Sequence, residues 1–401
     1  MDVRIYPSSI KGFTEAISPK NAALRTLLAA SLSREDVSVK FNNRSAEIFA
    51  AMQTLTASFA EVTREGSVYT VKPKEELPSV AEINLGGGAA ALRFLLAPLT
   101  AAGFKRINVT GDGGVLKRVL KELCEKLRGV ILTGETTPAT ITGKLKGGIY
   151  EFDESVPSGF IDGLIFALAM TKEGGEIRLS EKEAESKHVL SCVKAVNEAG
   201  KKAEISGGRI IIFGREEENG FSAPKIKEIA GEPLSAAPFY AAKILGGDIE
   251  IGNVSDKKGE EDIIRAMNEA KNGGVVGFKG ISAAAPFAAV CAAFSNRVCV
   301  IEKAFSKPKD GEAMEALKTN LVKMGASAEV TENGIKITGT GGLKGGVYVD
   351  GFGNARVAAA TAVAAIFAKE PTVLLSAEAA NKEYPEFFNE LIKLGARIES
   401  L

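Results

Sequence analysis

The stretch MEALKTNLVKMGASAEVTENGIKITG, residues 314–339, decides the fold class because its pattern recurs along the chain. It predicts an amphipathic helix, a small residue and then two short strands around a turn. Segments with the same pattern, of which the last two are shorter, span residues 48–71, 116–134, 189–214, 263–278 and 387–400. Self-similarity of this kind indicates a protein built from repeated structural units.

A second, more apolar helix is predicted ahead of each copy, and a short strand follows it. These helices are expected within residues 22–32, 89–103, 158–171, 235–247, 283–295 and 355–368. A further strand is expected before each of them, such as GFTEAIS at residues 12–18. The repeated unit is therefore β-α-β-α-β-β, six times over. The amphipathic helix of each unit should cover a sheet, whereas the helix that is apolar all round should be buried.

Three units per domain, each domain a ring of sheets around buried helices, is the simplest assembly. The proline- and charge-rich segment at residues 214–228 predicts the connection between units three and four. The extra strand at residues 2–9 fits the last unit, which lacks a final strand. We therefore expect an α/β (α+β) protein with one domain of residues 1–18 plus 222–401, an inserted domain of residues 19–221, and a ligand cleft between them.

Composition narrows the function classes. The 401 residues carry 50 basic and 50 acidic side chains, so there is no general attraction for nucleic acid or for an anionic membrane. No apolar run is long enough to span a bilayer, and the N-terminus lacks a signal-peptide pattern. Four cysteines without a CxxC pair, together with one histidine, make a zinc site improbable and indicate reduced, buried thiols. The expected location is the cytoplasm.

Basic residues gather where the apolar helices should begin. The starts of helices offer unpaired N–H groups and partial positive charge, which suit anions. Arginine adds bidentate recognition of phosphate or carboxylate. The residues concerned are Lys20, Arg25, Arg93, Arg118 and Arg356. For Arg25 and Arg93 the alternative is a structural role in a buried ion pair.

Other candidates carry less information. TGDGGVLKR, residues 110–118, has the wrong length and spacing for a Walker loop. His188 is either a ligand contact or a helix residue at an interface. The carboxylates near the helix starts offer acid or base groups, although no pair has a diagnostic spacing. They are Asp112, Asp153, Asp310 and Asp350.

Five motifs, in the same order and at the same unit positions, resemble those of the enolpyruvyl transferases, and the resemblance covers essentially the whole chain. SPKNAALR (18–25) resembles the family's Pro-Gly-Ser-Lys-Ser…Arg motif, and LGGGAAALRFL (85–95) its Gly-Asn-Ala-Gly-Thr…Arg motif. TGDGGVLKR retains an arginine at Arg118. GFGNAR (351–356) resembles Asn-Asp-His-Arg, and NKEYPEFF (381–388) resembles Lys-Ser/Thr-Phe-Pro-Asp-Phe.

The resemblance, which is nearest to the shikimate-pathway branch, implies a two-domain inside-out α/β barrel that acts as a monomer without a cofactor or metal. The implied reaction transfers the enolpyruvyl group of phosphoenolpyruvate to the 5-hydroxyl of shikimate 3-phosphate and releases phosphate. The implied catalytic residues are Lys20, Asp310 and Lys382. The implied substrate contacts are Lys20, Asn21, Arg25, Arg93, Arg118, Ser158, Lys309, Arg356 and Lys382.

Several positions depart from the family pattern. Ala283, Ala313 and Ala355 stand where the family has an Asp, an Arg and a His. At the second helix start, Gly87, Ala89 and Ala90 replace the family's Asn, Gly and Thr. Two alternatives therefore stay open. One is a non-catalytic homologue that binds a phosphorylated or carboxylate ligand, and the other is a transferase with another acceptor. The absence of a Cys from residues 110–118 argues against the branch that acts on UDP-N-acetylglucosamine.

Overall fold

The computed structural model describes residues 1–401 except 85–88, 112–115, 135–137, 154 and 215–219. The chain divides into two compact units. The continuous unit is Pro19–Ile229, and the discontinuous unit combines Met1–Ser18 with Ala230–Leu401. Each has a hydrophobic core of its own.

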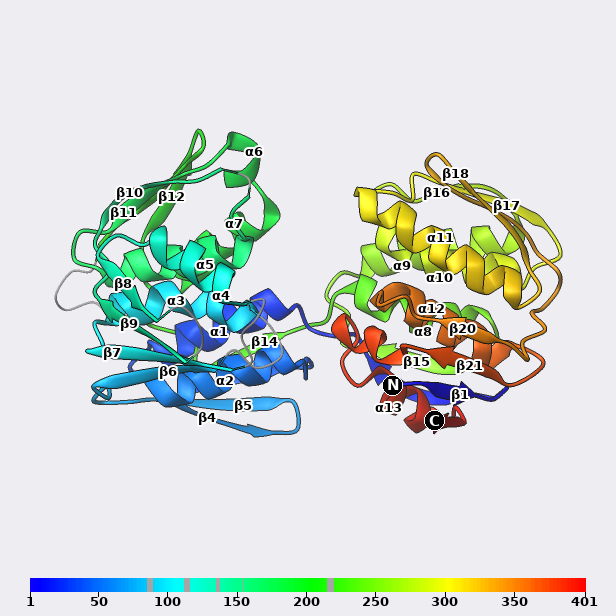
Figure 1. The fold of residues 1–401 in the computed structure, drawn as a ribbon, viewed down its shortest axis with the longest axis horizontal. Helices are drawn as coiled ribbons and strands as arrows, with labels where there is room; N and C mark the ends of the chain where they lie inside the picture. Colours follow the sequence, from blue (N-terminus) through cyan, green and yellow to red (C-terminus); the bar gives the residue numbers. More distant parts are fainter. Residues whose placement is uncertain (85–88, 112–115, 135–137, 154, 215–219) are drawn as a thin grey trace. The chain divides into compact units, whose positions relative to one another are not determined.

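In the continuous unit, three apolar helices lie inside and three four-stranded sheets lie around them (Figure 1). The inner helices are α1 (Lys20–Ser31), α3 (Ala90–Ala102) and α5 (Ser158–Met170). The other helices are α2 (Ala46–Ser58), α4 (Leu116–Glu125), α6 (Glu181–Ala184) and α7 (Lys187–Glu198). This arrangement agrees with the predicted burial of the helices that are apolar all round.

Every sheet of the continuous unit has one parallel and two antiparallel pairs. In spatial order, the first sheet is β14 (Ile226–Ile229), β3 (Val37–Phe41), β5 (Val68–Pro73) and β4 (Ala60–Glu65). The second is β6 (Val80–Asn84), β7 (Arg106–Thr110), β9 (Ala139–Gly143) and β8 (Val130–Thr133). The third is β10 (Gly148–Glu151), β11 (Gly175–Arg178), β13 (Arg209–Ile212) and β12 (Ala203–Ser206).

The discontinuous unit also surrounds three inner helices with sheets, and those helices contact one another (Figure 1). They are α8 (Ala237–Ile244), α10 (Ala285–Ala293) and α12 (Ala355–Phe367), of which the first two follow the short 3-10 turns η1 (Pro233–Ala236) and η2 (Ser282–Ala284). The remaining helices are α9 (Lys257–Asn272), α11 (Pro308–Lys323), η3 (Ala377–Lys382) and α13 (Phe387–Lys393).

Two of the sheets in this unit have four strands, and one has two. In spatial order, the first four-stranded sheet is β16 (Gly274–Gly277), β17 (Val298–Glu302), β19 (Gly334–Thr338) and β18 (Ser327–Thr331). The second is β20 (Tyr348–Asp350), β21 (Thr372–Leu375), β1 (Val3–Ile5) and β22 (Ile398–Ser400). The third pairs β2 (Lys11–Glu15) with β15 (Asp248–Gly252). The fourth unit therefore lacks the hairpin that the sixfold pattern predicts, because the strand after α9 pairs with β17 instead.

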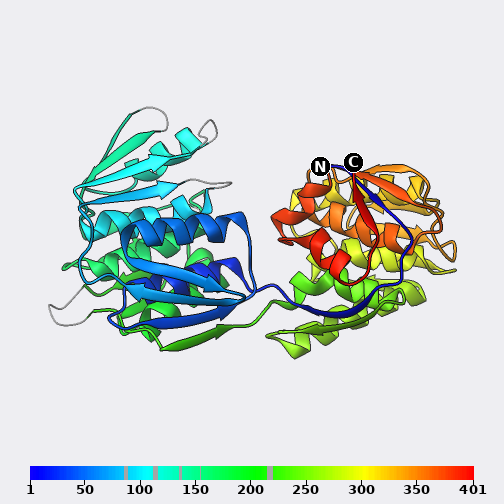
Figure 2. The ribbon, with the colours of Figure 1, turned by 90° about the horizontal axis from the view of Figure 1, so that it is seen from below.

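The ends of the chain meet in one sheet. Strand β1 lies between β21 and β22 and is antiparallel to both. Figure 2 shows the two termini side by side. The N-terminal strand thus completes the last unit, as the sequence pattern predicts.

A paired strand lies just before each of the two connections between the units. Strand β2, within the expected first strand of unit one, pairs with β15 of the discontinuous unit. The strand parallel to β3 is β14, from the second connection. Residues 222–229 therefore belong to the continuous unit, and the second crossing lies at Ile229–Ala230 rather than at 221–222.

Close approach of inner helices depends on a small residue in α5. A Cβ built on Gly163 lies 2.2 Å from the carbonyl oxygen of Phe94 in α3. A real side chain at this position would push the two helices apart. Gly163 therefore sets the spacing of the helices that carry Arg93 and Ser158.

Candidate functional site

The first predicted cation lies at the start of α1. Lys20 is the first residue of the helix, and its ammonium pairs with Glu47 in the first turn of α2. Asn21, the next residue, is exposed. Pro19 precedes the helix without a side-chain cap, and the first turn holds no acidic residue, so its backbone N–H groups are not capped by a side chain. This end of α1 has the chemistry of an anion site, with Glu47 as the present counter-ion of Lys20.

Arg25, one turn further along α1, has an internal partner. Its Nη1 donates a hydrogen bond of 2.8 Å to Oδ2 of Asp162 in α5. Arg25 is 8% exposed and Asp162 is 1% exposed. Of the two alternatives for Arg25, the structure shows the buried ion pair, and its predicted contact with substrate stays a prediction. The signal for the pair was a single carboxylate in the otherwise apolar segment 158–170.

Two opposing effects act on the ionisation of Asp162, namely its burial and the charge of Arg25. Burial raises the pKa of Asp162 above its ordinary value of 3.8, and the charge and hydrogen bond of Arg25 oppose that rise. The Asp162 backbone carbonyl accepts a 3.6 Å contact from Cys192 Sγ, and burial raises the thiol pKa of Cys192 well above its ordinary value. Oδ1 of Asp162 is buried and has no hydrogen-bond partner within the part of the chain the structure describes.

Arg93 is the predicted cation with an unsatisfied donor. It lies in the first turn of α3, and its Cβ is 3.8 Å from where a Cβ on Gly159 would lie. Among the described residues its buried Nε finds no hydrogen-bond partner. Ser158, the first residue of α5, is adjacent in sequence to Gly159 and half-buried. The structure therefore brings the starts of α3 and α5 together, as a shared anion site requires.

Some predicted residues lie outside the described structure or away from these helix starts. Arg118 belongs to α4, but its side chain is outside the described residues, as are Asp112 and Gly87. Asp153 is exposed, and hydrogen bonds from Ser155 lower its pKa, so this carboxylate is held in a local turn.

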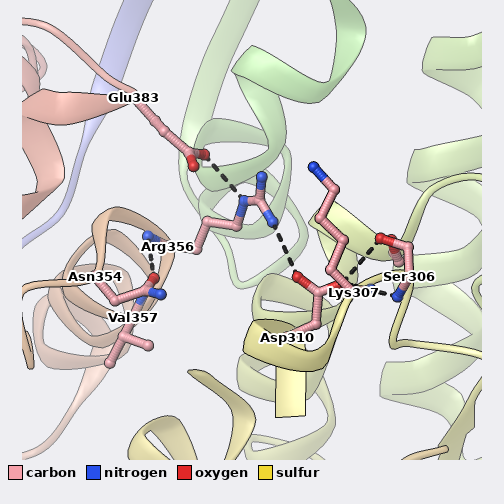
Figure 3. A network of polar contacts seen from close by, with 8 residues as sticks. Ser306, Lys307, Asp310, Asn354, Arg356, Val357 and Glu383 are labelled. Carbon is pink, nitrogen blue, oxygen red and sulfur yellow. Dashed lines mark hydrogen bonds and ion pairs between the residues drawn. The ribbon is translucent and has the colours of Figure 1, made fainter. Parts of the chain in front are cut away.

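In the discontinuous unit, Asp310, Arg356 and Glu383 come together near the starts of α11 and α12 (Figure 3). Arg356 Nε donates a 3.0 Å hydrogen bond to Oε2 of Glu383, and its Nη1 lies 3.8 Å from Oδ1 of Asp310. Lys382, at the end of η3, donates a 3.0 Å hydrogen bond to the carbonyl of Gly353. Arg356, Asp310 and Glu383 thus come from three separate segments of the chain and share one polar cluster.

Asp310 also caps α11. Its Oδ2 accepts hydrogen bonds of 2.7–2.9 Å from the Ser306 and Lys307 backbone N–H groups and from the Ser306 hydroxyl. Burial acts to raise the pKa of Asp310, but these hydrogen bonds and the charge of Arg356 outweigh it and lower the pKa below 3.8. The carboxylate is thus held ionised, which makes it a weak base at neutral pH.

The remaining positions near this cluster are small, exposed or otherwise engaged. Lys309 lies exposed in the first turn of α11. Ala283, Ala313 and Ala355 contribute methyl groups from η2, α11 and α12. The side chain of Asp350 accepts a 2.7 Å hydrogen bond from the backbone N–H of Phe352, so it shapes the loop before α12.

His188 lies at the start of α7 in the continuous unit. Its Nδ1 is 3.0 Å from the Ser186 hydroxyl, and its Nε2 is 4.0 Å from Glu183. The described residues contain no group of three or more His, Cys, Asp or Glu side chains placed to hold a metal ion. His188 is thus a partly buried residue in the first turn of α7, and neither of its two predicted roles is tested by these contacts. No helix in the described part of the chain is both long and apolar enough to cross a membrane.

A family model for EPSP synthase (3-phosphoshikimate 1-carboxyvinyltransferase) matches residues 6–273 and 256–391. The chain belongs to the EPSP synthase family. Among curated proteins, the 3-phosphoshikimate 1-carboxyvinyltransferase of Clostridium novyi is 27% identical, with 99% of this chain and 98% of that protein aligned. The enzyme of that name from Aeropyrum pernix is 26% identical over 100% of this chain and 97% of its own. The resemblance predicted from the five motifs is confirmed.

Solved structures show that the fold is shared as well. EPSP synthase from Acinetobacter baumannii superimposes with a TM-score of 0.76 over 100% of both chains, at 17% identity. The enolpyruvyl transferase NikO from Streptomyces tendae gives a TM-score of 0.69 at 16% identity, covering 99% of this chain and 98% of its own. The predicted enolpyruvyl transferase fold is therefore confirmed.

Proposed function

We propose that this EPSP synthase family member transfers the enolpyruvyl group of phosphoenolpyruvate to the 5-hydroxyl of shikimate 3-phosphate. The observation that carries the proposal is the match of the whole chain to the family, with Lys20, Arg93 and Arg356 each in the first turn of an inner helix. Both substrates are polyanions, and first turns with cationic side chains suit phosphate and carboxylate groups.

The reaction proceeds by addition and elimination. A proton adds to C3 of phosphoenolpyruvate while the 5-hydroxyl oxygen bonds to C2 and loses its proton, which gives a tetrahedral ketal phosphate. The C–O bond to phosphate then breaks, C3 loses a proton, and the enol ether and inorganic phosphate leave. Cationic side chains stabilise the departing phosphate, so the proposed steps need no cofactor or metal.

The geometry suggests different roles for the predicted catalytic residues. Lys20 and Lys382 offer N–H donors that can stabilise an anion. Asp310 is a weak base because its Oδ2 already accepts three hydrogen bonds. We therefore propose that Asp310 acts mainly by orienting Arg356, which it faces at 3.8 Å. The remaining proposed substrate contacts are Asn21, Ser158, Lys309 and Arg118. Arg25 is also a proposed substrate contact, and it would keep its ion pair with Asp162 while the substrate is bound.

The proposed setting is a monomer in the cytoplasm. The four cysteines are free and buried, which agrees with a reducing compartment. Burial raises the pKa of the Cys124 thiol to about 12, so this cysteine stays protonated and serves no nucleophilic role.

The test mixes the protein with shikimate 3-phosphate and phosphoenolpyruvate and measures released phosphate. We expect turnover that depends on both substrates and is lost in Lys20→Ala and in Arg93→Ala, while Cys124→Ser retains it. Lack of turnover together with retained phosphoenolpyruvate binding would instead identify a non-catalytic homologue. Turnover with UDP-N-acetylglucosamine and not with shikimate 3-phosphate would assign another acceptor.

A further inference from the structure

Arg356 is flanked by two carboxylates of its own unit. Glu383 follows η3 and accepts a 3.0 Å hydrogen bond from Nε, while Asp310 lies 3.8 Å from Nη1 (Figure 3). The two carboxylates approach the guanidinium from opposite sides. The positive charge that an anionic ligand would meet at Arg356 is therefore already compensated.

The two carboxylates differ in what else they bind. Asp310 caps α11, so its position follows from the helix start. The side chain of Glu383 is 46% exposed, and Arg356 is the one hydrogen-bond partner of its carboxylate in the described ranges. The fold of η3 does not depend on this contact, since the Glu383 backbone N–H is bonded separately to Ala380.

From this geometry we propose that Glu383 sets the affinity of this site for anions, because it competes with the phosphate or carboxylate group of a ligand for Arg356. The proposal rests on the proposed function, because it takes Arg356 as a substrate contact. A ligand anion at Arg356 must displace the Glu383 carboxylate or bind beside it against like-charge repulsion. Because the pair is half-exposed, displacement is feasible, and the competition lowers anion affinity by a modest factor.

The experiment measures binding of inorganic phosphate, and separately of phosphoenolpyruvate, by calorimetry of the full chain. Glu383→Gln keeps the side-chain length and an oxygen that accepts from Arg356 Nε, but it removes the charge. We expect phosphate affinity to rise about two- to fivefold at low ionic strength, the range that an exposed ion pair contributes. The gain should shrink in 1 M salt, where the Debye length falls to about 3 Å.

Two matched controls separate this mechanism from general electrostatics. Glu390→Gln removes one negative charge that pairs with Lys393 at 3.2 Å on α13 rather than with Arg356, and it should leave phosphate affinity unchanged. In an Arg356→Ala background, Glu383→Gln should no longer raise the affinity, because the competition has lost its target. Thermal unfolding should be nearly the same for all the Gln variants, which excludes a structural explanation.

The outcomes decide the proposal independently of catalysis, since phosphate binding needs no turnover. It is overturned if Glu383→Gln weakens phosphate binding or leaves it unchanged, or if Glu390→Gln gives an equal gain. It is also overturned if neither wild type nor Glu383→Gln binds phosphate. An inactive protein that shows the predicted gain would refute the proposed function and leave the role of Glu383 intact.

Discussion

The buried pair of Arg25 and Asp162 makes a strong prediction about stability. Both side chains are almost fully inaccessible to water, and their charged atoms lie 2.8 Å apart. Replacing Asp162 by Asn preserves its shape but leaves the arginine charge uncompensated in the core. Removal of one partner from a buried ion pair costs about 3–5 kcal/mol, a large fraction of the roughly 5–15 kcal/mol that stabilises a typical domain.

The double replacement should behave differently. In Arg25→Met with Asp162→Leu no charge is left to desolvate, and apolar side chains of similar volume fill the site. Such replacements are often neutral or stabilising. We therefore expect each single variant to be about 3–5 kcal/mol less stable than wild type and the double variant to recover most of that loss.

The pH dependence of Arg25→Met gives an independent check. Burial raises the pKa of Asp162, and Arg25 is the main group that opposes the rise, so the pKa climbs further in the variant. A carboxyl with a raised pKa binds more protons in the folded than in the unfolded state, so stability falls as pH increases from about 3.8 through the folded pKa. The penalty of Arg25→Met should therefore be larger at pH 7 than at pH 4.

Urea unfolding of the full chain, followed by circular dichroism at pH 4 and pH 7, tests both expectations. The reasoning is refuted if Asp162→Asn costs less than about 1 kcal/mol, a value typical of exposed pairs. It is equally refuted if the Arg25→Met penalty is larger at pH 4 than at pH 7.

Two further predictions concern helix geometry. Gly163→Ala should destabilise the protein by about 1–3 kcal/mol, because its Cβ would lie 2.2 Å from the Phe94 carbonyl oxygen; in urea unfolding, Gly277→Ala, where nothing lies within 4 Å, serves as the control. Asp310→Asn should cost roughly 1 kcal/mol through a weaker cap. Since the folded pKa of Asp310 is lowered, its contribution should be present above about pH 3.8 and disappear as the pH falls through the folded pKa, so thermal unfolding of wild type and variant should converge in acid.

The inner helices were predictable because burial of a helix follows from a local sequence that is apolar on nearly all sides. The segment 355–367, for example, is apolar on nearly every side apart from Arg356 and Thr361, and the corresponding α12 is buried along nearly its full length. The position of β1 in the sheet of the last unit was also predictable, because the sequence of that unit has one strand fewer than the others.

The sequence did not predict that β2 pairs with β15 and that β14 pairs with β3. Each segment has a strand pattern, but the pattern does not specify which of two equivalent edges the strand joins. The partner of Arg25 was accessible in principle, because isolated charges in two apolar helices require compensation. Finding Asp162, 137 residues away, needed the packing of α1 against α5.

Three predicted cations therefore carry internal counter-ions, and burial determines which of these a ligand can replace. Asp162 is fully enclosed, so an anion cannot take its place at Arg25 without leaving a buried carboxylate unpaired. Glu47 and Glu383 are partly exposed and can turn into water when a ligand phosphate arrives. It follows that Lys20 and Arg356 are suited to exchange their carboxylates for substrate, whereas Arg25 is suited to hold α1 against α5, so that Lys20 keeps its position as the ligand binds.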